Sequence, residues 1–87
     1  MAEQIVELPP FADALRNALL DRLPGSRVQA EQIRGDRYRF AVIWDGFRNL
    51  GHPDRQRQVW AVADQIVGNA DLLNVGMIIT MSPDEIG

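Results

Sequence analysis

Three arginines and the only histidine of the chain, His52, lie close together in the middle of the sequence. Guanidinium groups bind phosphates and carboxylates through paired hydrogen bonds, so Arg48, Arg55 and Arg57 indicate a binding surface. Pro53 suits the first turn of a helix, because N–H groups in that turn lack helical partners and proline has no N–H. We therefore expect a helix that begins near Pro53 and displays Arg55 and Arg57 to solvent.

The same stretch offers little for catalysis or metal binding. His52 has only Asp45 and Asp54 near it in sequence, and one imidazole with scattered carboxylates does not make a metal site. We find no Ser-His-Asp arrangement or glycine-rich phosphate loop, and the absence of cysteine excludes thiolate nucleophiles and cysteine ligands from this chain. We therefore expect no enzymatic activity, no cofactor and no metal, and a solvated or helix-capping role for His52.

Two classes of partner fit an arginine-bearing surface. The formal charge of −3 argues against the broad positive footprint of a strong nucleic-acid binder. The Gly-x-x-Gly loop that clamps nucleic acid in many KH domains is also missing, since four residues separate Gly46 from Gly51. Ion pairs with Asp54, Asp64 or the loop would instead make the arginines an ordinary solvated face. A protein partner is the leading hypothesis, and nucleic acid is the alternative.

Length and composition limit the organisation of the chain. Its 87 residues are enough for one compact domain with a modest core, so we expect a single domain over residues 1–87. Residues 1–8 form a lead-in, which Pro9 and Pro10 separate from the rest. No apolar run reaches the roughly 20 residues of a membrane helix, and the first residues lack the features of a signal peptide. A cytoplasmic protein without a membrane partner is expected.

Two stretches have the apolar spacing of helices with one buried face. The first stripe consists of Phe11, Leu15, Leu19 and Leu23, supported by Ala12, Ala18 and Leu20, and it stops at Pro24-Gly25. The second consists of Val59, Trp60, Ala63, Ile66 and Val67, and it stops at Gly68-Asn69. Residues 71–73 add a brief turn. Both stripes, together with Trp44 on a strand face, are expected in the core.

Three stretches alternate as strands do. Residues 26–33 place Val28 and Ala30 on one side, and residues 38–44 place Tyr38, Phe40, Val42 and Trp44 on one face. The turn Arg34-Gly35-Asp36 joins them as an antiparallel hairpin. Residues 75–81 are apolar on both sides, as a covered or central strand would be. With a right-handed crossover to the third strand, the fold class is α+β, a three-stranded mixed sheet covered on one face by helices in the order α-β-β-α-α-β.

Three runs of residues resemble the BolA family: residues 39–47, 55–60 and 74–85. In that family a strand rich in Phe and Val leads to a Phe-containing loop, then to an Arg-His-Arg motif followed by an apolar residue and a tyrosine, and later to a strand that begins His-Ala. The resemblance covers nearly the whole chain from Phe11. It implies a fold like a class II KH domain, and it implies a monothiol glutaredoxin as a partner.

The departures from the family pattern concern function. Gln56 stands where the Arg-His-Arg motif has its histidine, and Trp60 stands where it has tyrosine. Asn74 occupies the position of the histidine that helps to ligate a 2Fe-2S cluster shared with glutaredoxin, and asparagine is a poor iron ligand. The hairpin turn is shorter than the family loop that supplies a second Cys or His ligand. We therefore expect a non-enzymatic adaptor or regulatory domain without iron-sulfur ligation by this chain, whose binding surface comprises Arg48, His52, Arg55, Arg57 and Asn74.

Overall fold

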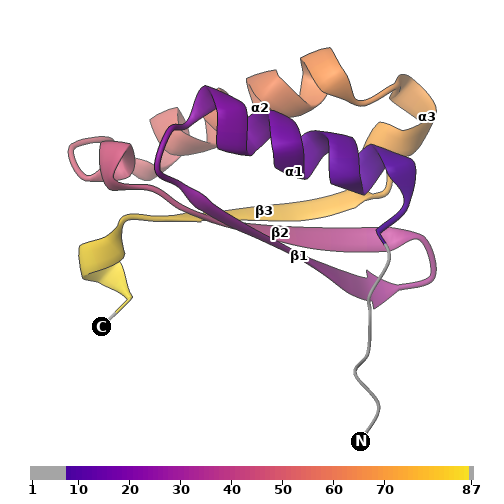
Figure 1. Ribbon diagram of the computed structural model, residues 1–87, viewed down its shortest axis with the longest axis horizontal. Coiled ribbons are helices and arrows are strands. Elements are labelled where there is room, and N and C mark those ends of the chain that lie inside the picture. The colour runs from indigo at the N-terminus through magenta and orange to yellow at the C-terminus, as the bar shows by residue number, and fades with distance from the viewer. Residues whose placement is uncertain (1–7, 87) are drawn as a thin grey trace, which may run out of the picture.

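The computed structural model describes residues 8–86 and shows the expected order of elements (Figure 1). The helices are α1 (Pro10–Arg22), α2 (His52–Ile66) and the short α3 (Asn69–Leu72). The strands are β1 (Arg27–Arg34), β2 (Arg37–Ile43) and β3 (Val75–Met81), and the 3-10 helices η1 (Asp45–Phe47) and η2 (Pro83–Glu85) follow β2 and β3. Apart from Leu8, the predicted lead-in lies outside the described residues. No helix in the described part of the chain has the length and apolar character that a bilayer crossing requires.

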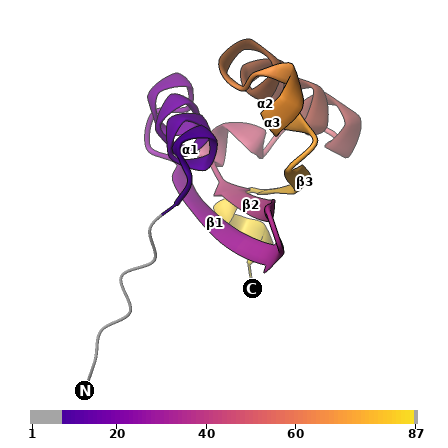
Figure 2. The same cartoon turned by 90° about the vertical axis from the view of Figure 1, so that its right-hand side faces the viewer.

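The sheet has the order β1-β2-β3, with β2 antiparallel to β1 and parallel to β3. Only Gly35 and Asp36 separate β1 from β2, and Gly35 has a φ of 54°, which glycine adopts without steric cost. Figure 2 shows α1 and α2 side by side over the same face of the sheet. The predicted α+β fold, a mixed sheet with helices on one face, is confirmed.

The core lies between the sheet and these two helices. Alternate residues of β2 (Tyr38, Phe40 and Val42) are buried, because successive side chains of a strand point to opposite faces. They pack with the predicted stripes of the helices, and the buried members of those stripes are Ala12, Leu15, Leu19, Leu23, Val59, Ala63 and Val67. The helical and strand periodicities therefore identified most of the core.

Several residues of the predicted core are exposed or only half-buried. Ile66, the last residue of α2, is 41% exposed, whereas Val67 directly after it is buried. Leu20 is also exposed, at 38%. Trp44 follows β2 rather than belonging to it, and both Trp44 and Trp60 are only half-buried against the core. The predicted stripes therefore include Leu20 and Ile66, which the structure leaves exposed, although Leu23 and Val67 at the helix ends are buried.

The prediction that residues 75–81 form a covered or central strand is wrong. β3 is an edge strand, and only its inward residues Val75, Ile78 and Thr80 are buried. Gln56 on α2 protects part of the free edge, because its side-chain amide donates a hydrogen bond of 2.8 Å to the carbonyl oxygen of Ile78. Trp60 fixes this amide by donating a 3.0 Å hydrogen bond to its oxygen. An apolar pattern on both sides of a strand thus did not reveal whether both sides are covered.

Candidate functional site

The loop between β2 and α2 is built around two aromatic rings. Trp44 and fully buried Phe47 pack edge to face, with ring centroids 5.2 Å apart and an interplanar angle of 88°. The indole N–H of Trp44 donates a 2.9 Å hydrogen bond to the carbonyl oxygen of Pro24. A Cβ at Gly46 would overlap the Trp44 ring, so close packing requires glycine there. These contacts fix the loop that carries Arg48 and leads into α2.

The structure contradicts the expectation that Arg55 is displayed to solvent. The Arg55 side chain is only 9% exposed, and its guanidinium forms a bidentate ion pair with Glu85 at 2.7 and 2.9 Å. Its Nε donates a hydrogen bond of 2.8 Å to the Leu50 carbonyl oxygen, and the guanidinium lies 5.7 Å from the centroid of the Phe47 ring. Arg55 therefore joins the loop, α2 and the C-terminal η2 from the inside.

The carboxylate of Glu85 has a second role, in capping η2. It accepts a hydrogen bond of 3.0 Å from the backbone N–H of Ser82, and the Ser82 and Glu85 side chains form a reciprocal capping box. Hydrogen bonds from Arg55 and from this N–H lower the pKa of Glu85 from 4.5 to about 2. The carboxylate of Asp84 also has a lowered pKa, chiefly because the Ser82 hydroxyl donates a hydrogen bond to it.

We expect the Arg55–Glu85 pair to make the stability of the fold depend on pH in the acidic range. Because the pKa of Glu85 is lower in the folded chain than its ordinary 4.5, the pair stabilises the fold fully above pH 4.5 and is lost as the pH falls towards about 2. The variant Glu85→Gln should therefore lose less thermal stability over that range than the wild type. Thermal unfolding followed by circular dichroism across this pH window measures the difference. Equal slopes for the two proteins would contradict the ionic role of Glu85.

Arg48 and Arg57 are exposed, as predicted, but each has a carboxylate partner. Arg48 binds Asp45 at 2.7 Å and lies 3.6 Å from Asp84. Arg57 binds Asp54 at 2.8 Å, and its side chain is 76% exposed. We call one group of residues the arginine corner. It consists of Arg48, Arg55 and Arg57, their carboxylate partners Asp45, Asp54, Asp84 and Glu85, and His52. Four carboxylates thus accompany three guanidiniums, and the corner carries no excess of positive charge.

The structure separates Asn74 from the other predicted site residues. His52 is the exposed first residue of α2 and belongs to the corner, whereas Asn74 precedes β3 at the opposite end of the sheet (Figure 1). Its carbonyl oxygen accepts a hydrogen bond of 2.8 Å from the Tyr38 N–H. Asn74 lines a pocket of about 410 Å³. The other residues that line this pocket include Phe11 of α1, Asp36 of the hairpin turn and Asp71 of α3.

This pocket brings together the two places where the family resemblance implies cluster ligands, the hairpin turn and the residue before the third strand. Their side chains here are those of Asp36 and Asn74, with Asp71 nearby. Iron-sulfur clusters in proteins are held by thiolates and imidazoles, whereas these are hard oxygen donors. The chain has no cysteine, and its only histidine lies at the arginine corner. These residues therefore do not fit a 2Fe-2S cluster.

Within residues 8–86, no three His, Cys, Asp or Glu side chains are grouped so that they could hold a metal ion. Sequence reasoning missed the partner of Arg55, although Ser82-Pro83-Asp84-Glu85 carries the spacing of a capping box and so signalled that Glu85 has a structural role. It also missed that Gln56 and Trp60, which both depart from the family motif, form one hydrogen-bonded chain that ends on β3.

Comparison with solved structures places the fold. The BolA domain of SufE1 from Arabidopsis thaliana matches with a TM-score of 0.72 and 15% identity, over 91% of this chain and 99% of that one. BolA1 from Arabidopsis thaliana matches with a TM-score of 0.70 and 15% identity, over 88% of this chain and 96% of that one. A Bol-like protein from Babesia bovis matches with a TM-score of 0.55 and 18% identity, over 97% of this chain and 93% of that one.

At these identities the likeness concerns the fold. The chain has the BolA fold, and the resemblance found in its sequence is confirmed at that level. No protein-family model matches the chain, and no curated protein sequence matches it.

Proposed function

We propose that this chain, which has the BolA fold, is a non-catalytic adaptor or regulatory domain that binds a protein partner through the exposed side of the arginine corner. The observation that supports this proposal is the pairing of every arginine of the corner with a carboxylate. Paired charges of both signs suit the polar rim of a protein interface, where they set register and exclude wrong partners.

The same pairing weighs against the nucleic-acid alternative. A surface that neutralises phosphates needs arginines whose charge is not already neutralised, because binding depends on the release of counterions from the nucleic acid. In the corner, carboxylates outnumber guanidiniums. A protein partner can instead exchange these surface ion pairs for its own at little cost, since each exposed pair contributes only about 0–1 kcal/mol.

The four corner residues have different roles in this proposal. Arg48, His52 and Arg57 are exposed and contact the partner. Arg55 is buried and positions them, because it ties the start of α2 to the loop and to η2. Asn74 lies about 20 Å away along the sheet, given the rise of roughly 3.3 Å per strand residue. It therefore makes a separate contact, reached only by a partner that extends along the sheet.

Replacing both exposed arginines, Arg48→Glu and Arg57→Glu, should abolish capture of the partner by the immobilised protein while leaving the fold intact. The reason is that the charge of the corner's outer surface is inverted, whereas the buried Arg55–Glu85 pair is untouched. Quantitative mass spectrometry of proteins retained from a nuclease-treated cell extract measures the loss. A monothiol glutaredoxin among them would identify the partner class that the family resemblance implies.

The matched control is Arg22→Glu. Arg22 is an exposed arginine of α1 whose guanidinium donates to Gln65, at the far end of α2 from His52. This variant changes the net charge in the same direction and should retain the partner. Equal capture by the wild type and the corner variant would refute the surface assignment. Capture that occurs from an untreated extract but not from the nuclease-treated one would favour the nucleic-acid alternative.

A further inference from the structure

The face of the sheet opposite α1 and α2 is apolar along β3, along part of β2 and at Ile33 near the end of β1. Side chains on this face alternate with the buried ones, and the strand register aligns Ala41 with Ile79 and Ile43 with Met81. The apolar residues of the face are Ile33, Ala41, Ile43, Met77, Ile79 and Met81. Ile33 and Met77 are each 49% exposed, and no helix of residues 8–86 covers this face between the hairpin and η2 (Figures 1 and 2).

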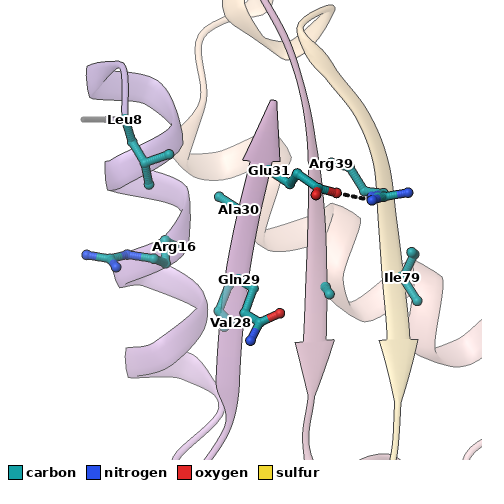
Figure 3. Close-up of a pocket in the computed structure, with 9 residues that line it drawn as sticks. Leu8, Arg16, Val28, Gln29, Ala30, Glu31, Arg39 and Ile79 are labelled. Carbon is teal, nitrogen blue, oxygen red and sulfur yellow. Dashed lines mark hydrogen bonds and ion pairs between the residues drawn. The ribbon is translucent and has the colours of Figure 1, made fainter. Parts of the chain in front are cut away.

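Arginines flank this apolar strip. Arg27 aligns with Ile43, and Arg37 and Arg39 alternate with the buried residues of β2, so all three belong to the uncovered face. On the three strands of this face the carboxylate is that of Glu31, which forms an ion pair with Arg39 (Figure 3). Among residues 8–86, Arg27 and Arg37 have no carboxylate within ion-pair distance. The face is therefore positive on a chain whose formal charge is −3.

The uncovered face is also hollowed. An open hollow of about 800 Å³ is lined on this face by Glu31, Arg39, Ala41 and Ile79, and it continues past the edge of β1 to Arg16 on α1 (Figure 3). The uncovered face thus combines an apolar floor with a rim of arginines. Such a surface favours an occupant that brings aliphatic side chains to the floor and carboxylates to the rim.

We propose that the uncovered face of the sheet docks an acidic amphipathic helix of a protein partner, with aliphatic residues on one side and Asp or Glu beside them. A helix is the usual cover for a sheet face, since its single apolar stripe matches the flat apolar surface. This surface shares no residue with the arginine corner, so failure of one assignment leaves the other standing.

Three other occupants fit less well. A second copy stacked face to face would bring the arginines of both copies together. Single-stranded nucleic acid would need aromatic platforms for its bases, and every aromatic side chain of the chain lies on α1, on α2, on the inward side of β2 or in the loop after it. An added strand at β3 would compete with Gln56 for the Ile78 carbonyl oxygen.

The test is selection from a random display library of peptides of about 16 residues, which span roughly 24 Å as a helix. Selected peptides should be rich in Asp or Glu and in aliphatic residues. Their binding should shift the backbone amide resonances of Ala41, Ile79 and Met81. The peptides themselves should become helical on binding, as circular dichroism would show. The affinity should fall about tenfold or more in Ile79→Glu and in the double variant Arg37→Glu with Arg39→Glu, and should weaken as salt rises.

Two further variants keep the test decisive. Met77→Glu changes a half-exposed residue, so it should fold and should also weaken binding, and Arg22→Glu on the helix layer should bind as the wild type does. The proposal is overturned if no peptide is enriched, if enriched peptides are basic or uncharged, or if the shifted resonances lie elsewhere. Self-association that Ile79→Glu removes, or oligonucleotide binding that the arginine variant removes, would assign the face to those occupants instead.

Discussion

Replacing Arg55 with alanine should lower the midpoint of thermal unfolding by on the order of 10 °C, whereas Arg57→Ala should change it by no more than about 2 °C. Both residues are arginines near the start of α2 that bind carboxylates, but the Arg55 side chain is 9% exposed and that of Arg57 is 76% exposed. Alanine at position 55 leaves the Leu50 carbonyl without its side-chain donor and leaves the Glu85 carboxylate with only the hydrogen bond from the Ser82 N–H. Circular dichroism at neutral pH measures both midpoints.

Arg55→Lys separates charge from geometry in the same measurement. Lysine keeps the positive charge but cannot form the two parallel hydrogen bonds to Glu85 and donate to Leu50 at once, so its midpoint should fall between those of the wild type and the alanine variant. Arg55→Ala should also remove most of the acid dependence assigned to Glu85, because its pKa would return towards 4.5. Equal midpoints for Arg55→Ala and Arg57→Ala would show that burial does not distinguish the two arginines.

The role of Arg55 marks how far the sequence could predict the site. Residues four apart share one face of a helix, so the distance from Arg55 to buried Val59 already placed Arg55 on the inward side. Its charge led instead to a prediction of exposure. The partner could not be found from spacing, because Glu85 lies on a different element and only folding brings the two together. Helical spacing therefore predicts which face of the helix carries Arg55. It does not predict the ion pair with Glu85 that stabilises this arginine in a buried position.

The fold was more predictable than the site. Period-two and helical patterns report which side of an element faces inward, and that sufficed for the hairpin, both long helices and most of the core. The same patterns do not report what lies on the other side of a strand. For β3 the apolar residues on the second side, such as Met77, proved to lie on an uncovered face rather than beneath a further layer. Whether such a face binds a partner depends on molecules outside the chain.

Phe47→Ala should destabilise the protein by about 3–5 kcal/mol, which is comparable with the entire stability expected of a domain of this size. Phe47 is fully buried, packs edge to face on Trp44 and lies beneath the Arg55 guanidinium. The variant loses the apolar contacts of the ring and leaves a cavity at the point where the loop, α2 and η2 converge. Urea unfolding followed by circular dichroism measures the change, and a midpoint close to that of the wild type would contradict this central role.

Phe47→Leu is the matched variant, because it retains much of the buried volume and removes only the aromatic contacts with Trp44 and Arg55. Those contacts are worth roughly 1–2 kcal/mol together, so this variant should remain folded. It then tests whether the loop must be rigid for binding. If the exposed side of the arginine corner works as proposed, Phe47→Leu should weaken partner capture although Arg48, His52 and Arg57 are all present, since the ring holds the loop and the start of α2 in one arrangement.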